Sequence, residues 1–210
     1  MTKVKARFAL LALLLPFLLH ATYILKNDLL KPYTSNLIEK MGNELFEKTG
    51  ISEYVVASNE NFVEKFNLVE YSKKYEVNMS KPYVMLIFAP NAVITNKSGQ
   101  KGRVALIPST PDIGKLYNKN SVMDATIDVV AVNDKNSKED KFNIGIVQGF
   151  SELADQIADA KNVKLTTTIP NDTRTMIGYL KILVYIGSLF VLWIFMIRPL
   201  IMRIKNGKTK

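Results

Sequence analysis

The feature that most constrains this chain is a long apolar stretch near the C-terminus, from Met176 to Met202. The run Ile182–Ile197 contains no charged residue, and Lys181 and Arg198 lie on either side of it. A helix of this run rises about 24 Å, short of a hydrocarbon core of ~30 Å. The long apolar stem of Lys181 can reach toward the interface, which extends the span back to Ile177. We therefore predict a transmembrane helix over residues 176–202, with Lys181, Trp193 and Arg198 as its membrane-anchoring residues.

The charges that flank this helix predict its orientation. Beyond Ile197 the chain carries five basic residues and no acidic residue, which is typical of a cytoplasmic flank under the positive-inside rule. Residues 203–210 are therefore expected to form a basic cytoplasmic tail. The alternative, a buried core helix, requires a large domain around it, and only this short tail follows.

The N-terminus is compatible with the same orientation. Residues 1–7 contain three basic residues, and an apolar segment runs from Phe8 to Leu25. Residues 1–25 are either a cleavable signal peptide or an uncleaved signal anchor. The anchor is favoured because Leu19 occupies a position where cleavage requires a small residue, and because apolar residues resume at Tyr23. Both interpretations place the chain from residue 26 onward outside the cytoplasm.

The net charge of +9 lies entirely in these two flanks. Residues 1–25 hold three Lys/Arg, residues 176–210 hold six, and neither segment has an acidic residue. Residues 26–175 hold nineteen basic and nineteen acidic residues. A nucleic-acid-binding protein would carry its positive charge on the folded domain, so no nucleic-acid partner is expected. The chain has no cysteine, which excludes disulfides and thiolate metal sites.

Helical and strand patterns alternate within residues 26–162. Apolar residues at helical spacing follow a predicted cap at Thr34 or Ser35, and Gly50 is a plausible helix end. The apolar run Tyr83–Ala89 suits a buried central strand, with Arg103–Ile107 as its return strand. The sequence therefore predicts an α/β fold, a small sheet sandwiched by helices and flanked by an N-terminal and a C-terminal transmembrane helix. The remaining predicted elements are a strand at 51–57, helices at about 61–75, 121–132 and 142–160, and a tether at 163–175.

The residues that common catalytic sites require are missing. The only histidine, His20, lies in the N-terminal apolar segment, and no nucleophilic cysteine, HExxH, P-loop or GxGxxG motif is present. Oxygen ligands for a hard cation such as Ca²⁺ are the remaining possibility. Asp124 and Asp128 share one helical face and Asp112 lies in the preceding loop, so these three are the candidate metal ligands. The alternative is a solvated helix face with a capping aspartate.

Several short motifs occur in an order that resembles a known family. They are Asn27–Leu30 (NDLL), Glu47–Gly50 (EKTG), Tyr83–Ala89 (YVMLIFA) and Lys141–Gly149 (KFNIGIVQG). In this order they resemble the TPM-domain family, over about residues 27–160. The resemblance implies an extracytoplasmic α/β domain, commonly with a C-terminal membrane helix. It further implies an accessory or repair factor for a membrane complex, such as photosystem II, or an auxiliary subunit of a receptor.

The chain departs from that family at one loop. Members commonly have a glycine-rich turn after the return strand, whereas this chain has Ile107–Gly114 (IPSTPDIG), where only Asp112 matches the acidic position. Phosphatase activity and Ca²⁺ binding are attributed to some members, and the changed loop weakens their transfer to this chain. Two alternative functions are a weak acid phosphatase that depends on a divalent cation, and a solute-sensing domain.

Together these observations predict a domain anchored in the inner membrane. The domain at residues 26–162 is expected in the periplasm, and the C-terminus in the cytoplasm. The expected partners are the lipid bilayer and a membrane protein complex that the domain helps to assemble, maintain or regulate. An enzymatic role is not favoured, and Ca²⁺ is the one cofactor that the residues suggest.

Overall fold

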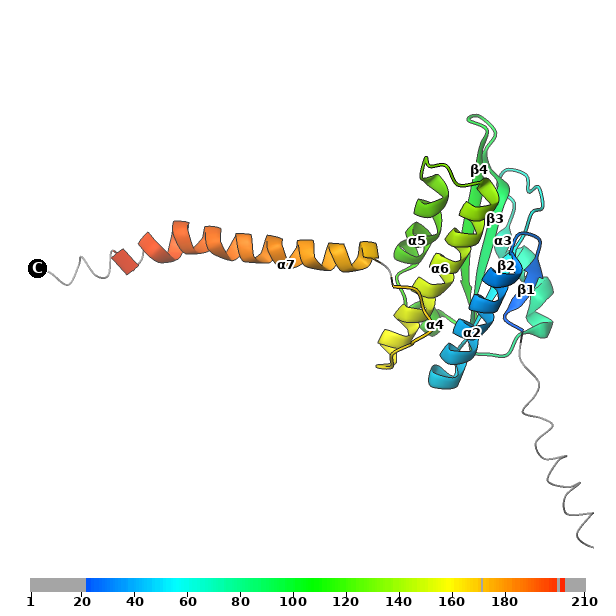
Figure 1. Ribbon diagram of the computed structural model, residues 1–210, viewed down its shortest axis with the longest axis horizontal. Helices are drawn as coiled ribbons and strands as arrows, with labels where there is room; N and C mark the ends of the chain where they lie inside the picture. The colour runs from blue at the N-terminus through cyan, green and yellow to red at the C-terminus, as the bar shows by residue number, and fades with distance from the viewer. Residues whose placement is uncertain (1–21, 171, 200, 203–210) are drawn as a thin grey trace, which may run out of the picture. The chain divides into compact units, whose positions relative to one another are not determined.

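The computed structural model describes residues 22–170, 172–199 and 201–202 (Figure 1). The chain divides into two compact units, Met1–Ile169 and Pro170–Lys210. In the first unit a mixed four-stranded sheet has the strand order β1-β2-β3-β4. The first three strands are parallel and β4 is antiparallel to β3. The strands are β1 (Ile24–Asn27), β2 (Ser52–Ala57), β3 (Tyr83–Thr95) and β4 (Gln100–Pro108).

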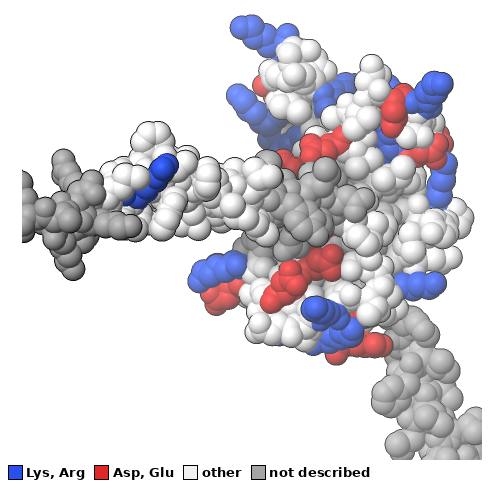
Figure 2. Space-filling view, turned by 60° about the vertical axis from the view of Figure 1, so that its left-hand side comes forward, with Lys and Arg blue, Asp and Glu red and all other residues white. Residues whose placement is uncertain are grey.

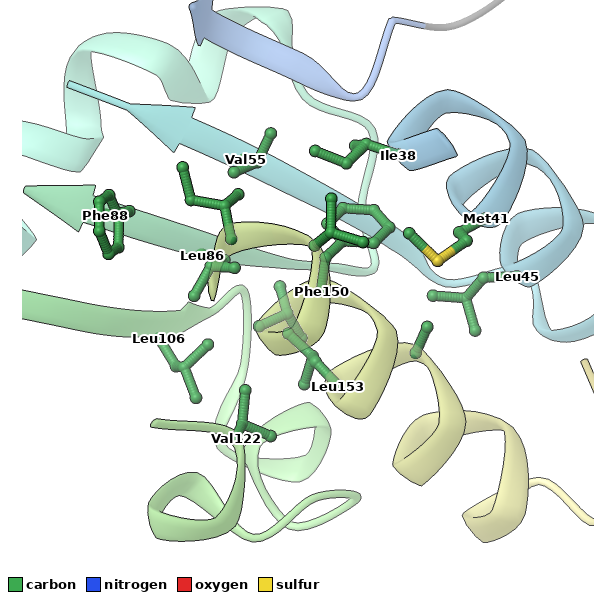
Figure 3. Packing of buried hydrophobic residues seen from close by; sticks show 14 of the residues in the cluster. Ile38, Met41, Leu45, Val55, Leu86, Phe88, Leu106, Val122, Phe150 and Leu153 are labelled. Atoms are coloured by element: carbon green, nitrogen blue, oxygen red, sulfur yellow. The ribbon is translucent and has the colours of Figure 1, made fainter. Parts of the chain in front are cut away.

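Helices cover both faces of this sheet, with unequal thickness. Helices α2 (Pro32–Thr49), α5 (Lys119–Ala131) and α6 (Lys138–Ala160) pack on one face. Figure 3 shows this larger core, which includes Ile38 of α2, Val122 of α5, Phe150 of α6 and Leu86 of β3. The other face is covered by the short α3 (Leu68–Ser72) and the 3₁₀ helix Lys73–Asn78. The predicted α/β class is therefore confirmed.

The strand β3 forms where the sequence predicts a buried central strand. It pairs with β2 on one side and β4 on the other, and residues 83–89 are all buried. A strand that packs on both faces needs apolar residues at successive positions, which explains the continuous apolar run. Its partner β4 includes the predicted return strand at residues 103–107.

Two predicted helix starts are wrong. Helix α2 begins at Pro32 after Lys31, which makes no capping hydrogen bond through its side chain. The predicted cap Thr34 lies inside the first turn and is buried. The second helix begins at Leu68 rather than near residue 61, because Asn67 caps it by accepting hydrogen bonds from the backbone N–H groups of Val69 and Glu70.

One predicted helix end and one predicted helix are confirmed. Gly50 ends α2 in the left-handed conformation with φ of 70°, which favours glycine. The predicted helix at 142–160 also forms, but it begins earlier, at Lys138, because Ser137 caps it.

Glycine has a second role in α6, where this helix crosses α5. A Cβ atom at Gly149 would lie 2.0 Å from Oγ1 of Thr126, so this close approach of the two helices requires glycine.

The domain extends beyond both of its predicted boundaries. Tyr23, which we placed in the N-terminal apolar segment, has an exposed fraction of 1% within the domain, and β1 begins at Ile24. The apolar residues after Ala21 thus belong to the sheet and its core rather than to the segment before them. Residues 1–21, which contain the rest of that segment, lie outside the described residues.

The predicted tether at 163–175 is held on the domain over its first half. The backbone N–H groups of Thr166 and Thr167 donate to the Glu44 carboxylate at 2.8–2.9 Å, and the Oγ of Ser151 accepts from the N–H of Ile169 at 2.7 Å. The first unit therefore extends to Ile169.

The second unit contains α7 (Asp172–Leu192), followed by a π-helical turn (Trp193–Ile197). The large apolar side chains from Ile182 to Ile197 are all exposed. Within the described part of the chain, no helix has both the length and the apolar character that a membrane crossing requires.

Candidate functional site

The carboxyl ends of the three parallel strands bring together polar residues that are far apart in the sequence. Asp28 follows β1, Asn59 lies beyond the end of β2, and Asn91 lies in the outer half of β3. The backbone N–H of Asn59 donates to Oδ2 of Asp28 at 3.0 Å. The amide of Asn91 donates to Oδ1 of Asn59 at 2.8 Å. Ligands of open α/β sheets commonly bind at this edge, so these three residues are the centre of our candidate site.

A charged cluster adjoins this polar row. Lys26 of β1 forms ion pairs with Asp28, at 3.2 Å, and with Glu60. The hydroxyl of Tyr71 donates to Oε1 of Glu60 at 3.1 Å. Each charged group of the cluster therefore has a partner of opposite charge or a hydrogen-bond donor.

The environment of this cluster keeps its members charged at neutral pH. Burial lowers the pKa of Lys26, but its hydrogen bonds to Glu60 and Asp28 outweigh this effect and raise the pKa above its usual value. The pKa of Glu60 is lowered, mainly by the hydrogen bond from Lys26. Burial raises the pKa of Asp28, but the bonds from Asn59 and Lys26 lower it overall. Groups with such shifts are suited to binding rather than to proton transfer near pH 7.

A second unusual carboxyl group lies deep in the core. Glu53 on β2 is fully buried, and neither of its carboxyl oxygens has a hydrogen-bond partner among the described residues. Burial, and then the charge of Asp155, raises the pKa of Glu53 well above its usual value. The pKa of Tyr117 is raised to about 12, by burial and then by the charge of Glu53. The sequence motifs do not single out Glu53 as a site residue, although it is the single acidic residue in the apolar strand Ile51–Ala57.

The three predicted metal ligands lie on two separate helices. Asp112 is in α4 (Pro111–Gly114) and forms an exposed ion pair with Lys115 at 2.8 Å. Asp124 and Asp128 are exposed on α5, one turn apart as predicted. No group of three or more His, Cys, Asp or Glu residues in the described ranges is arranged to hold a metal ion.

The predicted membrane-anchoring residues lie along the second unit. Lys181 is in α7, Trp193 begins the π-helical turn, and Arg198 directly follows that turn. The indole of Trp193 is exposed, like the apolar side chains around it.

No protein-family model matches this sequence, and no curated protein shows significant similarity to it. The resemblance to the TPM-domain family thus stays a prediction.

Proposed function

We propose that this chain is a membrane-anchored extracytoplasmic domain. We further propose that it acts as an accessory factor in the assembly, maintenance or regulation of a membrane protein complex. The observation that carries this proposal is the exposed apolar surface of the second unit. From Ile182 to Ile197 the surface is built from large apolar side chains, among them Phe195 with an exposed fraction of 74%.

Exposed apolar surface of this extent needs a covering. Burial of apolar surface contributes about 25 cal/mol for each Å², and soluble domains rarely expose contiguous apolar patches beyond a few hundred Å². The apolar run is divided between α7, which ends at Leu192, and the π-helical turn that follows it. Figure 2 shows the described surface of this segment as almost entirely uncharged. Lipid is the covering that we propose.

The distribution of charge supports the proposed orientation. The described surface of the domain carries interspersed basic and acidic side chains (Figure 2), as expected from the nineteen of each in residues 26–175. The basic excess lies instead in the two flanks. We propose that both flanks face the cytoplasm and that the domain lies in the periplasm.

The candidate site favours an accessory role over hydrolysis. Its charged groups are paired with one another, and their pKa shifts keep them charged at neutral pH. A general acid or base needs a pKa near the working pH. A polar row such as Asp28, Asn59 and Asn91 can instead supply hydrogen bonds to a partner that docks at this edge of the sheet.

Two experiments on the full chain test the proposal. In the first, membranes are washed with alkaline carbonate, and we expect the protein to stay in the pellet. A variant with Ile186→Lys and Phe190→Lys keeps the N-terminal segment as its remaining anchor, so we expect a larger fraction of it than of the unaltered protein in the supernatant, because each charge is costly in hydrocarbon. Release of the unaltered protein would contradict membrane anchoring.

The second experiment is purification in mild detergent. We expect a defined membrane protein to copurify, and the Asn59→Ala/Asn91→Ala variant to recover less of it. A matched control, Asn120→Ala on the exposed surface of α5, should recover the normal amount. Recovery of the same partner by all three proteins would show that the carboxyl edge is not the docking surface. Absence of any partner would contradict the accessory role.

A further inference from the structure

A groove of about 760 Å³ lies beside the candidate site, on the face of the sheet that α5 and α6 cover. Its walls come from the outer half of β3, the start of β4, the end of α5 and the start of α6. Phe88 and Phe142 lie in its lining, edge to face, with their ring centroids 5.5 Å apart. The volume is in the range of pockets that hold small organic molecules, about 300–1,000 Å³.

The charge of the lining is of one sign. Four basic residues line the groove and no acidic residue does. Two of the four are already engaged, because Arg103 donates to the carbonyl of Phe66 at 2.6 Å and Lys141 forms an ion pair with Asp134 at 3.1 Å. Lys101 and Lys138 are exposed, and the ammonium group of neither forms a hydrogen bond or ion pair with the other described residues. These two ammonium groups are available for an anion.

The rest of the lining is mainly apolar. Ile94 and Ile127 line the groove and have exposed fractions of 49% and 42%. These two side chains lie in the groove with the Phe88–Phe142 pair, so one cavity offers both apolar surface and positive charge. A strongly hydrated inorganic anion would use only the charge, whereas an organic anion with an apolar body would use both.

We propose that this groove binds a small organic anion, in which an apolar or aromatic body carries a phosphate or carboxylate group. The apolar body contacts Phe142 and Ile127, and the anionic group lies between Lys101 and Lys138. Ligand binding here is independent of the proposed membrane anchor, since every residue of the site belongs to the first unit.

The test uses ¹⁹F NMR on the full chain in nanodiscs of zwitterionic lipid. The probe is 4-fluorophenyl phosphate, titrated to 10 mM, and 4-fluorobenzyl alcohol is its neutral counterpart. We expect the phosphate probe to bind at least tenfold more tightly than the alcohol. Inorganic phosphate at the same concentration should not displace it, because that ion lacks the apolar body.

Variants then locate the binding. Each exposed ion pair is worth up to about a fivefold change in affinity, so Lys101→Gln/Lys138→Gln should weaken the phosphate probe by about 25-fold. Ile127→Ser should weaken both probes by about threefold, because it removes apolar contact area. The matched control, Lys40→Gln/Lys119→Gln, removes two exposed charges outside the groove and should leave the affinity unchanged.

Three results would overturn the proposal. One is the absence of binding at 10 mM in a protein whose thermal unfolding is normal. Another is equal weakening by the groove pair and the control pair, which would indicate general attraction of anions to a basic surface. The third is full displacement by inorganic phosphate. None of these results bears on the carbonate test of anchoring, so the two proposals can fail separately.

Discussion

Glu44 and Glu53 are separated by one helix end and one turn, yet their carboxyl groups have opposite surroundings. Glu44 on α2 accepts hydrogen bonds from the N–H and hydroxyl groups of Thr166 and Thr167 and forms an ion pair with Lys48. Glu53 on β2 is fully buried, and its oxygens accept no hydrogen bond from the described residues. Glu44 thus holds Thr166 and Thr167 on α2, and we call this set of contacts the clamp. Glu53, in contrast, is a buried carboxyl group without a hydrogen-bond partner among the described residues.

Their pKa shifts differ in sign for the same reason. Burial raises the pKa of Glu44, but the bonds from Lys48 and the two threonines outweigh it and lower the pKa far below its usual value. For Glu53 burial acts without compensation, and the charge of Asp155 adds to it. The comparison shows that the hydrogen-bond donors around a carboxyl group, rather than its degree of burial alone, decide which form the fold stabilises.

The largest effect is expected at the clamp. Glu44→Ala removes the acceptor that holds residues 166–167 on α2, and we expect it to lower the free energy of unfolding by about 3 kcal/mol at pH 7. Chemical denaturation of the full chain, followed by tyrosine fluorescence, measures this change. Hydrogen exchange at Thr166 and Thr167 should accelerate in parallel. The control Glu47→Ala, on the same helix but exposed, should change stability by less than about 0.5 kcal/mol.

The clamp also predicts an acid-sensitive contribution to stability. The folded pKa of Glu44 lies below its unfolded value of 4.5, so its contribution is present above that pH and is lost as the pH falls toward the folded pKa. The difference between the normal protein and Glu44→Ala should therefore shrink below about pH 4. A difference that is constant from pH 3 to pH 8 would contradict the assigned role of the carboxylate.

The second effect has the opposite direction. Glu53→Leu replaces a buried carboxyl group without hydrogen-bond partners by an apolar side chain of similar size, and we expect it to stabilise the protein by about 2 kcal/mol at pH 8. The folded pKa of Glu53 is above the unfolded value of 4.5. As the pH rises past that value, the unfolded chain releases its proton first, and the normal protein loses stability until the folded carboxyl group also ionises.

The gain from Glu53→Leu should consequently be smaller at pH 4 than at pH 8. Denaturation at the two pH values measures it, and Glu53→Gln serves as the matched variant because it removes the ionisation but keeps the shape. Glu53→Gln should remove most of the change in unfolding free energy between pH 4 and pH 8 that the ionisation of Glu53 causes. If both variants destabilise the protein equally at pH 4 and pH 8, Glu53 has a structural partner.

Sequence reasoning works for features that depend on neighbouring residues, and it fails for features that depend on residues far along the chain. The run Tyr83–Ala89 predicts a central strand because a strand buried on both faces must be apolar throughout, and the structure confirms it. Gly50 predicts a helix end because glycine favours the left-handed conformation at that position, which is also a local property. Glu53 could have been noticed as the one acidic residue in an apolar strand, but its surroundings include Asp155 of α6 and Tyr117 of the loop before α5, which are distant in the sequence.

The boundaries of the domain were harder to predict for the same reason. Residues 163–175 are rich in threonine and read as a tether, yet Thr166 and Thr167 find their acceptor on α2, more than a hundred residues earlier. The candidate site is also a product of topology. Asp28, Asn59 and Asn91 have no common motif, and they meet because β1 and β2 end beside the part of β3 that contains Asn91. The predicted acidic ligands failed to form a cluster because spacing on one helix says nothing about Asp112 on another.

The smallest effect separates side-chain from backbone contributions to the clamp. Thr167→Val removes the hydroxyl that donates to Glu44 at 2.6 Å but keeps the backbone N–H bond at 2.8 Å. We expect a loss of about 1 kcal/mol, measured by denaturation. Thr168→Val is the control, because the Thr168 hydroxyl donates no hydrogen bond to Glu44. In the Glu44→Ala background, Thr167→Val should cost almost nothing, since the acceptor is gone. An undiminished cost there would mean that Thr167 stabilises the domain through contacts other than Glu44.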